Sequence, residues 1–427
     1  MHSHPTILLI GTLDTKQVEL GRVREAIVQL GAAVLVLDAS VGGAASQDGA
    51  DFSAGIVAAA AGTSIAELAG LSRGDAVAIM QRGVTAVTTD LVRDGRVDGA
   101  LCVGGAGAHL AAAAFQQLEI GFPKLIVSPL ASGMRQFEPY TGLRDVAVMH
   151  TVADIAGVNE LIDKVYRQAA GYIVGAARAM QEVQADGSAS SGLPMVAASM
   201  NGNTTPAVTR ARDALSDAGY DLVAFHANGA GGRAMESLVA AGHFEAVLDF
   251  TTTELCFYEL GGLMDPGPTR MEAAGQMALP QVLVPGCIDF ITTGRYEEAE
   301  REYAGRRLYR HNPELTLVRL EAAEMGRLGE TFARKASAAR GPVAVCVPMR
   351  GFSLADSEGG PFWDPDADLE FVAALQAGVA PHVQVELVDA HVNDPSFVDV
   401  VVENLLSMED RPPAAASPER GGGDVIR

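Results

Sequence analysis

Short aliphatic runs that end in glycine and then lead into a helical pattern recur along this 427-residue chain. Ile7 to Lys16 (ILLIGTLDTK), Val103 to Ala111 (VGGAGAHLA) and Phe225 to Glu236 (FHANGAGGRAME) all follow this plan. Strand–turn–helix alternation of this kind builds βαβ units, in which the strands are parallel. Hydrophobic residues make up 48% of the chain and aromatic residues only 5%, which suits strands that helices cover on both faces. The sequence therefore predicts an α/β fold.

A small, polar stretch at 183–194 (VQADGSASSGLP) divides this alternation into two halves, and its composition is typical of a linker. We predict two Rossmann-like domains, at 1–182 and 195–410, with mainly parallel sheets and flanking helices. The last segment, 411–427, contains adjacent prolines, adjacent glycines and no aliphatic periodicity, so we expect a disordered tail.

Charge and cysteine usage exclude several classes of protein. The formal net charge of −22 argues against nucleic-acid binding through a basic surface. No apolar stretch reaches the ~18 residues that a membrane span needs, and no secretory signal is evident at the N-terminus. The four cysteines lie in or beside apolar runs without a CxxC pair, which favours buried, reduced thiols and a cytoplasmic protein.

Ligands of open α/β sheets bind beyond the carboxyl ends of the strands, so the loops there are the candidate sites. In the first half, the loop from Gly11 to Lys16 offers N–H groups, two hydroxyls and an ammonium to a phosphate. It is not a Walker A loop, and a capped helix start is the alternative. The turn from Gly104 to Gly107 fails the GxGxxG pattern, and close helix–strand packing is its alternative. Ser132 belongs to a third strand-end turn.

The second half delivers more polar residues to the strand ends. A glycine turn before a helix suits an anion. We predict that a small acidic ligand contacts Asn228, Gly229, Gly231, Gly232, Arg233, Thr251, Thr252 and Thr253. Because strand ends share one edge, we expect His226, Glu254, Asp289 and His391 to face one cleft as catalytic residues, with His226 or Glu254 as general acid/base.

Each of these residues also has a structural interpretation. A lone histidine at a strand end is usually structural. Cys287 is a candidate nucleophile, but a small core residue is the commoner case. No HExxH motif or paired Cys/His spacing is present, so no metal site of protein ligands is predicted.

Ten short motifs then appear in order between about residue 5 and residue 400. They are IGTLDTK, GGAG, SPLASG, DIAGVN, NTTP, FHANGAGGRAME, LDFTTTEL, PGCIDF, HNP and DAHVNDP. Together they resemble the Tm-1-like ATP-binding (UPF0261) family. The resemblance implies two α/β domains and ATP, with or without Mg²⁺, bound by the N-terminal glycine loops. The contacts that it implies are Gly11, Thr12, Asp14, Lys16, Gly104, Gly105, Gly107 and Ser132.

In plant relatives of this family the region is fused to a barrel domain resembling phosphoenolpyruvate hydrolases, so a separately encoded barrel protein is an expected partner. We expect a cytoplasmic, homo-oligomeric, ATP-binding protein, specifically a catabolic or ligase-like enzyme with a cleft between its two domains. Two alternatives stay open. One is a hydrolase or lyase that acts on an acidic small molecule in the second domain. The other is a non-enzymatic, nucleotide-dependent binding module.

Overall fold

The computed structural model describes residues 4–42, 49–105, 107–131, 137–186 and 192–409. It divides into an N-terminal domain, Met1–Ser190, and a C-terminal domain, Ser191–Arg427. Residues 183–186, at the start of the predicted linker, continue a helix instead. The segment 187–191 and the predicted tail, 411–427, lie outside the described residues.

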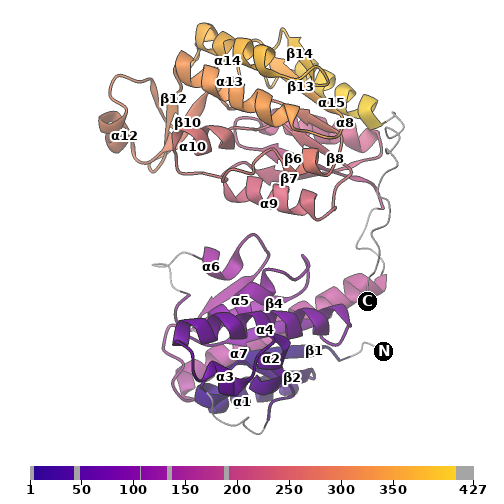
Figure 1. Ribbon diagram of the computed structural model, residues 1–427, viewed down its shortest axis with the longest axis vertical. Helices are drawn as coiled ribbons and strands as arrows, with labels where there is room; N and C mark the ends of the chain where they lie inside the picture. Colours follow the sequence, from indigo (N-terminus) through magenta and orange to yellow (C-terminus); the bar gives the residue numbers. More distant parts are fainter. Residues whose placement is uncertain (1–3, 43–48, 106, 132–136, 187–191, 410–427) are drawn as a thin grey trace, which may run out of the picture. The chain divides into compact units, whose positions relative to one another are not determined.

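The N-terminal domain, coloured indigo to magenta in Figure 1, contains one five-stranded parallel sheet. The order of its strands is β2-β1-β3-β4-β5. Its strands are β1 (Thr6–Gly11), β2 (Ala33–Asp38), β3 (Gly99–Val103), β4 (Lys124–Ser128) and β5 (Ala147–His150). Its helices are α1 (Leu13–Gln29), α2 (Ala54–Ala60), α3 (Ile65–Leu68), α4 (Arg73–Arg93), α5 (Ala108–Phe115), α6 (Glu138–Thr141) and α7 (Glu160–Asp186).

Both faces of this sheet are buried because successive side chains of a strand point to opposite faces. Ile7 and Leu9 of β1 pack in a core with α1 and α7. Leu8 and Ile10 pack in a second core with α2, α4 and α5. The helix after β1 therefore covers one face and the helix after β3 covers the other. The loops that follow the neighbouring strands β1 and β3 therefore lead to opposite faces of the sheet, and a crevice forms between them at the carboxyl edge.

The C-terminal domain repeats this arrangement with a six-stranded parallel sheet in the order β14-β13-β9-β8-β6-β7. Its strands are β6 (Met195–Met200), β7 (Asp221–His226), β8 (Ala246–Asp249), β9 (Gln281–Leu283), β13 (Val343–Pro348) and β14 (Gln384–Val388). Its flanking helices are α8 (Thr205–Asp217), α9 (Ala230–Ala240), α10 (Glu254–Leu260), α11 (Ala273–Gln276), α13 (Ala322–Ser337), α14 (Pro365–Gly378) and α15 (Pro395–Glu409).

Helices α8 and α15 cover one face of this second sheet, and α9, α13 and α14 cover the other. A small antiparallel sheet, separate from the large one, follows β9. It consists of β10 (Phe290–Thr293), β12 (Thr316–Arg319) and β11 (Leu308–Arg310), with α12 (Tyr296–Glu302) between β10 and β11. The aliphatic run at 315–320 indicates a strand but not its partner, which is why the sequence does not reveal this sheet. The predicted α/β fold with mainly parallel sheets is confirmed.

Two further expectations concern the cysteines and membrane-spanning helices. All four cysteines are buried and carry free thiols, as predicted. Within the described residues, even the longest helix lacks the apolar length that a membrane crossing requires.

Candidate functional site

The N-terminal domain has a pocket of about 910 Å³ at the carboxyl ends of β1 and β3, the crevice where the chain order of the sheet reverses. Small-molecule sites typically measure roughly 300–1,000 Å³ and favour this position in doubly wound sheets. The predicted nucleotide contacts Thr12, Asp14, Lys16, Gly105 and Gly107 all line it. Gly11 and Gly104 are buried and are not among its lining residues, and Ser132 lies outside the described residues.

Close packing requires glycine at one of these positions. A Cβ at Gly11 would stand 2.6 Å from the side chain of Leu20 on α1, whereas one at Gly107 would meet the Thr12 methyl group at an ordinary contact distance of 3.5 Å. Helix–strand packing, proposed for the turn from Gly104 to Gly107, therefore accounts for Gly11 instead. Gly105 differs, because a Cβ there would meet nothing within 4 Å. Its open face belongs to the pocket.

The first N–H groups of α1 already have partners within the protein. The amide of Leu13 donates to Asp38 Oδ1 at 3.0 Å, and the amide of Asp14 donates to Ser40 Oγ at 3.1 Å. Thr12 makes no capping hydrogen bond. Asp38 is the last residue of β2, and Ser40 follows that strand. The two amides therefore already have acceptors and are not free to bind a phosphate in the way that the sequence suggested. The glycine turn after β3 is the better source of backbone donors.

Lys16 is also engaged. Its Nζ donates to the carbonyl of Ile155 and lies 3.9 Å from Glu19 Oε1. Its backbone leaves the helical region, with φ −131° and ψ 25°. Glu19, in turn, accepts a hydrogen bond of 2.8 Å from the amide of Gly157. The DIAGVN motif, which contributed to the family resemblance, thus fastens the segment after β5 to α1. An anion can recruit Lys16 only if this ammonium shares or leaves the Ile155 carbonyl.

The rest of the pocket wall was not predicted from the sequence. Arg73, in the first turn of α4, lines the pocket, as do Asp154 and His109. The His109 ring stacks on Tyr140 with ring centroids 4.8 Å apart. A set of apolar side chains completes the wall: Val41, Leu68, Leu71, Val77 and Leu110. One sequence feature could have drawn attention to Arg73, because a cation in the first turn of a helix opposes the helix dipole.

The predicted anion site of the C-terminal domain is occupied by the protein itself. Glu254 Oε1 accepts hydrogen bonds from the amides of Gly229, at 2.5 Å, and Gly232, at 3.1 Å. A Cβ at Gly232 would lie 2.0 Å from Glu254 Oε2. The glycine turn does bind a carboxylate, as its chemistry predicts, but the carboxylate is an internal one. Glu254 is fully buried, which argues against the expected role as a general acid/base.

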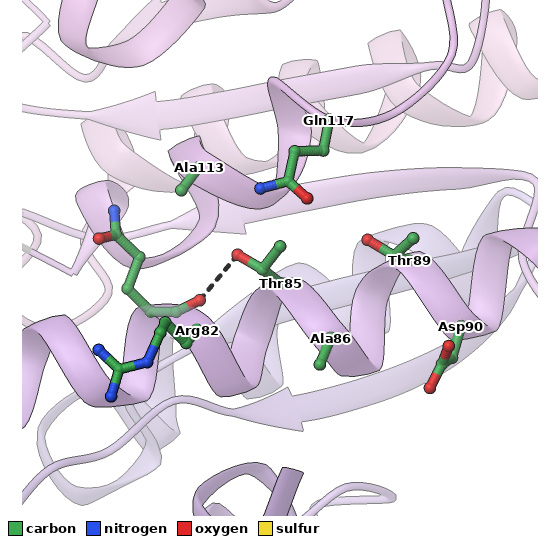
Figure 2. Close-up of a pocket in the computed structure, with 8 residues that line it drawn as sticks. Arg82, Thr85, Ala86, Thr89, Asp90, Ala113 and Gln117 are labelled. Atoms are coloured by element: carbon green, nitrogen blue, oxygen red, sulfur yellow. Dashed lines mark hydrogen bonds between the residues drawn. The ribbon is translucent and has the colours of Figure 1, made fainter. Parts of the chain in front are cut away.

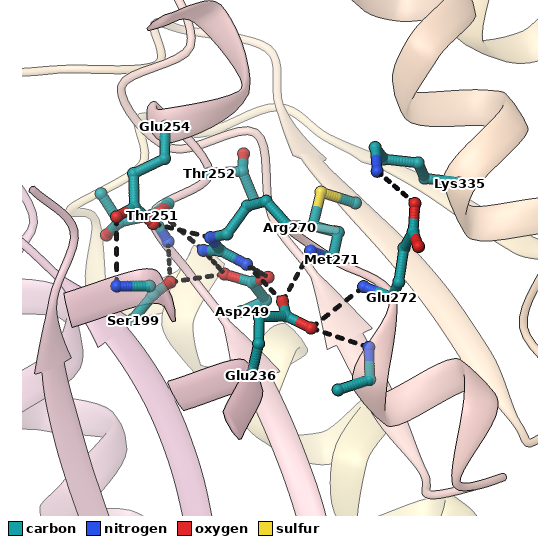
Figure 3. Close-up of polar contacts among 12 residues, drawn as sticks. Ser199, Glu236, Asp249, Thr251, Thr252, Glu254, Arg270, Met271, Glu272 and Lys335 are labelled. Atoms are coloured by element: carbon teal, nitrogen blue, oxygen red, sulfur yellow. Dashed lines mark hydrogen bonds and ion pairs between the residues drawn. The ribbon is translucent and has the colours of Figure 1, made fainter. Parts of the chain in front are cut away.

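Glu254 belongs to a buried ion-pair network around Arg270, which we call the Arg270 network (Figure 3). Arg270 Nη1 and Nη2 lie 2.5 and 2.6 Å from the two carboxylate oxygens of Asp249, and Nε lies 2.6 Å from Glu254 Oε2. Glu236 lies 3.3 Å from Nη1 and also accepts the amides of Met271 and Ala273. Burial raises the pKa of Glu236. One guanidinium therefore holds three carboxylates together, and the network joins β8, α9 and α10.

The threonines predicted to contact a ligand are buried as well. Thr251 Oγ1 lies 2.7 Å from Thr204 Oγ1, and Thr252 Oγ1 donates to the carbonyl of Val284 at 2.9 Å. The Thr253 hydroxyl is buried and has no hydrogen-bond partner among the described residues. The first two side chains connect strand-end loops to one another, and none of the three is at the surface.

His226 and His391 do not meet. His226 ends β7 and His391 follows β14, and these are the outermost strands on opposite sides of the sheet. Five strand spacings of ~4.8 Å separate these strands by roughly 24 Å, so the prediction of one shared cleft is wrong. His391 Nε2 lies 2.9 Å from the carbonyl of Ser353, and its Nδ1 accepts the amide of Asn393, which suits a structural role. His226 is exposed.

Two other residues of the predicted anion site lie at the surface next to His226. Asn228 is exposed, and its Oδ1 accepts the amide of Gly231 at 3.0 Å, which stabilises the turn. A Cβ at Gly231 would stand 1.9 Å from the carbonyl oxygen of His226, so close packing requires glycine there. Arg233 is exposed in the first turn of α9. Together, these contacts indicate that the turn is built for packing around Glu254.

Asp289, the fourth predicted catalytic residue, lies in a second buried polar cluster. Its Oδ2 accepts a hydrogen bond of 2.9 Å from Ser353 Oγ. Burial, and then the charge of Asp356, raises the pKa of Asp289 to about 7. Arg319 is the cation of this cluster and lies 2.6 Å from Asp368 Oδ1. The cluster joins the loops after β9 and β13 to α14.

Cys287 precedes this cluster and is fully buried. Burial, and then the charge of Asp289, raises the pKa of its thiol well above the usual value, which disfavours the thiolate that a nucleophile needs. Its backbone has a positive φ of 57°. The interpretation as an inert core residue is therefore the better supported of the two.

A hollow of about 370 Å³ lies over the outer surfaces of α4 and α5 (Figure 2). Arg82, Thr85, Thr89 and Asp90 of α4 line it together with Gln117, and no residue predicted to bind a ligand is among them. The Thr85 hydroxyl donates to the Gln81 carbonyl of its own helix at 2.8 Å. The hollow lies on a helix surface, away from the strand ends, and we assign no function to it.

These features define a class: a two-domain, doubly wound α/β protein. Its first sheet has a pocket at the point where the strand order reverses, and the strand ends of its second sheet carry buried ion pairs. The chain belongs to the UPF0261 family. The model of the family's N-terminal domain matches residues 5–182, and the model of its C-terminal domain matches residues 193–409. Both are described as an uncharacterised protein family. The predicted resemblance is thereby confirmed.

Individual relatives agree with this membership. A UPF0261 protein of Clostridium tetani is 34% identical over 409 residues, covering 95% of this chain and 99% of its own length. A UPF0261 protein of Mesorhizobium japonicum is 37% identical over 405 residues, covering 93% of this chain and 98% of its own length. The ToMV susceptible protein tm-1(GCR26) of Solanum lycopersicum is 33% identical over 342 residues. That match covers 79% of this chain but only 45% of the tomato protein.

Proposed function

We propose that the N-terminal domain binds a nucleotide, ATP with or without Mg²⁺, in the 910 Å³ pocket. The observation that supports this proposal most is the convergence of the Gly11–Lys16 loop and the Gly104–Gly107 turn on one pocket at the reversal point of the sheet. The pocket combines apolar side chains, which suit a base, with Lys16, Arg73 and glycine amides, which suit phosphates.

Two carboxylates on the pocket wall support the proposed Mg²⁺. Mg²⁺ is usually held by one or two carboxylates together with the phosphates of the ligand. Asp14 and Asp154 both lie on the wall. Asp14 Oδ1 is buried and has no hydrogen-bond partner in the part of the chain that the structure describes. A buried oxygen of this kind is costly unless a ligand satisfies it. These two carboxylates are the residues that would hold Mg²⁺.

A steric block of the pocket tests the proposal. Leucine in place of Gly105 would project into open space, so Gly105→Leu should fill the pocket with little effect on the fold. Isothermal titration calorimetry with ATP and Mg²⁺ should show micromolar to millimolar binding by the wild type and at least a tenfold loss in Gly105→Leu. Gly21→Leu is the matched control, because Gly21 is also unobstructed but lies on α1 away from the pocket. Equal affinities of all three proteins would refute the assignment of this pocket.

The wider role that we propose is that of a cytoplasmic, homo-oligomeric protein that uses its nucleotide in catabolic or ligase-like chemistry, with a barrel protein as a separate partner. The alternative of a hydrolase or lyase site in the C-terminal domain loses support, since Glu254 occupies the glycine turn and the predicted catalytic residues lie apart. A nucleotide-dependent binding module remains the second candidate, because a relative carries the description ToMV resistance protein Tm-1(GCR237). Assays of ATP turnover, with and without small carboxylic acids, separate an enzyme from a binding module.

A further inference from the structure

We infer that Arg73 selects ligands with a polyphosphate group in the N-terminal pocket, a role that rests on the proposed nucleotide site. The ligand class that follows is a nucleoside di- or triphosphate accompanied by a divalent cation. Arg73 was not among the residues predicted from the sequence to contact a ligand, and it lines the pocket together with Lys16, Asp14 and Asp154.

The first step is the availability of cations on the pocket wall. Lys16 donates to the Ile155 carbonyl and pairs with Glu19. The Arg73 side chain is exposed, and within the described ranges it makes no hydrogen bond, ion pair or ring contact. An anion that enters the pocket therefore meets one guanidinium that has no partner among the described residues and one ammonium that is already engaged. Arg73 can bind without breaking an existing contact.

The second step is the unfavourable electrostatic position of the Arg73 side chain at a helix N-terminus. Arg73 occupies the first helical position of the 21-residue helix α4, where the helix dipole disfavours a positive charge. Asp75 in the same turn favours the helix dipole, but it accepts the Ser72 hydroxyl at 2.7 Å and forms no ion pair with Arg73 among the described residues. A bound phosphate would interact favourably with both the guanidinium and the helix end. A residue that breaks a local rule of helix design is a candidate for a functional role.

The third step is the charge of the ligand. The wall carries two carboxylates, Asp14 and Asp154, beside the two cations. A ligand must therefore bring several negative charges to the cations and a divalent cation to the carboxylates. A nucleoside di- or triphosphate with Mg²⁺ satisfies both demands, whereas a monocarboxylate or a free nucleoside does not.

The experiment compares four ligands, which are ATP, ADP, AMP and adenosine, on four proteins in Mg²⁺ buffer. The proteins are the wild type, Arg73→Ala, Arg73→Lys and Arg82→Ala. Arg82 is the matched control, because it is an arginine on the same helix that lines the other hollow. Calorimetry should show a tenfold or larger loss of ATP and ADP affinity in Arg73→Ala, a smaller loss for AMP and none for adenosine. Arg73→Lys should recover part of the loss, and Arg82→Ala should bind like the wild type.

The outcomes separate this inference from the proposed function. If the wild type binds ATP and Arg73→Ala binds it equally well, the role of Arg73 is refuted while the nucleotide site stands. If Arg73→Ala weakens adenosine as much as ATP, Arg73 acts through the shape of the pocket, and its selection of phosphate is refuted. If the wild type binds none of the four ligands, both proposals fail. Far-ultraviolet circular dichroism of each variant confirms that the helix content is unchanged.

Discussion

Arg270→Ala is expected to destabilise the C-terminal domain by about 3–5 kcal/mol, the usual result of removing one partner from a buried ion pair. The substitution would leave Asp249, Glu254 and Glu236 buried around a cavity without their shared cation. Urea denaturation is the appropriate measurement. Trp363, the single tryptophan of the chain, lies in the C-terminal domain, so its fluorescence follows the unfolding of that domain alone.

Arg295→Ala is the control for this experiment. Arg295 forms a similar two-pronged pair with Glu314, but their side chains are 59% and 66% exposed, and such pairs contribute about 0–1 kcal/mol. An Arg270→Ala variant whose urea midpoint matched that of Arg295→Ala would contradict the proposed importance of the Arg270 network.

The second large effect is a dependence of stability on pH that Asp368 controls. Burial, and then the charge of Asp356, raises the pKa of Asp368 to about 9. In the native domain the Asp368 carboxyl therefore keeps its proton over a pH range in which the same carboxyl of the unfolded chain, with a pKa of about 4, has lost it. Stability must then fall as the pH rises from about 4 to about 9, by at most about 1.4 kcal/mol per pH unit for each retained proton. Asp368→Asn should remove this titrating carboxyl, while the asparagine amide oxygen can still accept a hydrogen bond from Arg319.

We expect Asp368→Asn to be more stable than the wild type at pH 8, by about 1 kcal/mol or more, with an advantage that shrinks toward pH 5. Urea midpoints at pH 5, 6.5 and 8, again followed by Trp363 fluorescence, measure this difference. Asp366→Asn on the exposed face of the same helix is the control and should leave the pH dependence unchanged. A wild type and an Asp368→Asn variant with parallel pH profiles would show that Asp368 is ionised in the native protein.

The fold was predictable because its determinants are local. Runs such as TILLIG read as strands, amphipathic segments read as helices, and their alternation permits little besides parallel sheets. The rule that ligands bind at the carboxyl ends of strands also placed Thr12, Lys16 and Gly105 on the same pocket.

What the sequence could not provide is the order of strands and the partners of polar groups. Both His226 and His391 lie at carboxyl ends of strands, so the sequence suggested that they are neighbours. The strand order β14-β13-β9-β8-β6-β7 places them at opposite ends of that edge. The glycine turn at 229–232 was interpreted as a site for an anionic ligand, whereas its amides bind a carboxylate of the protein itself. Its occupant, Glu254, lies more than twenty residues further along the chain, and only the fold brings the two together. Arg73 was missed because the pocket wall formed by α4 depends on tertiary packing.

Amide hydrogen exchange with and without saturating ATP and Mg²⁺ tests the central claim, a nucleotide site in the N-terminal pocket, most directly. We expect slower exchange at 12–16, 68–77 and 107–110, the segments that line the pocket. We expect no change at 229–232 or 251–254, where the backbone and side chains are already engaged within the C-terminal domain. Protection confined to 229–232 and 251–254, or unchanged exchange at all three pocket segments, would contradict a nucleotide site in the N-terminal domain.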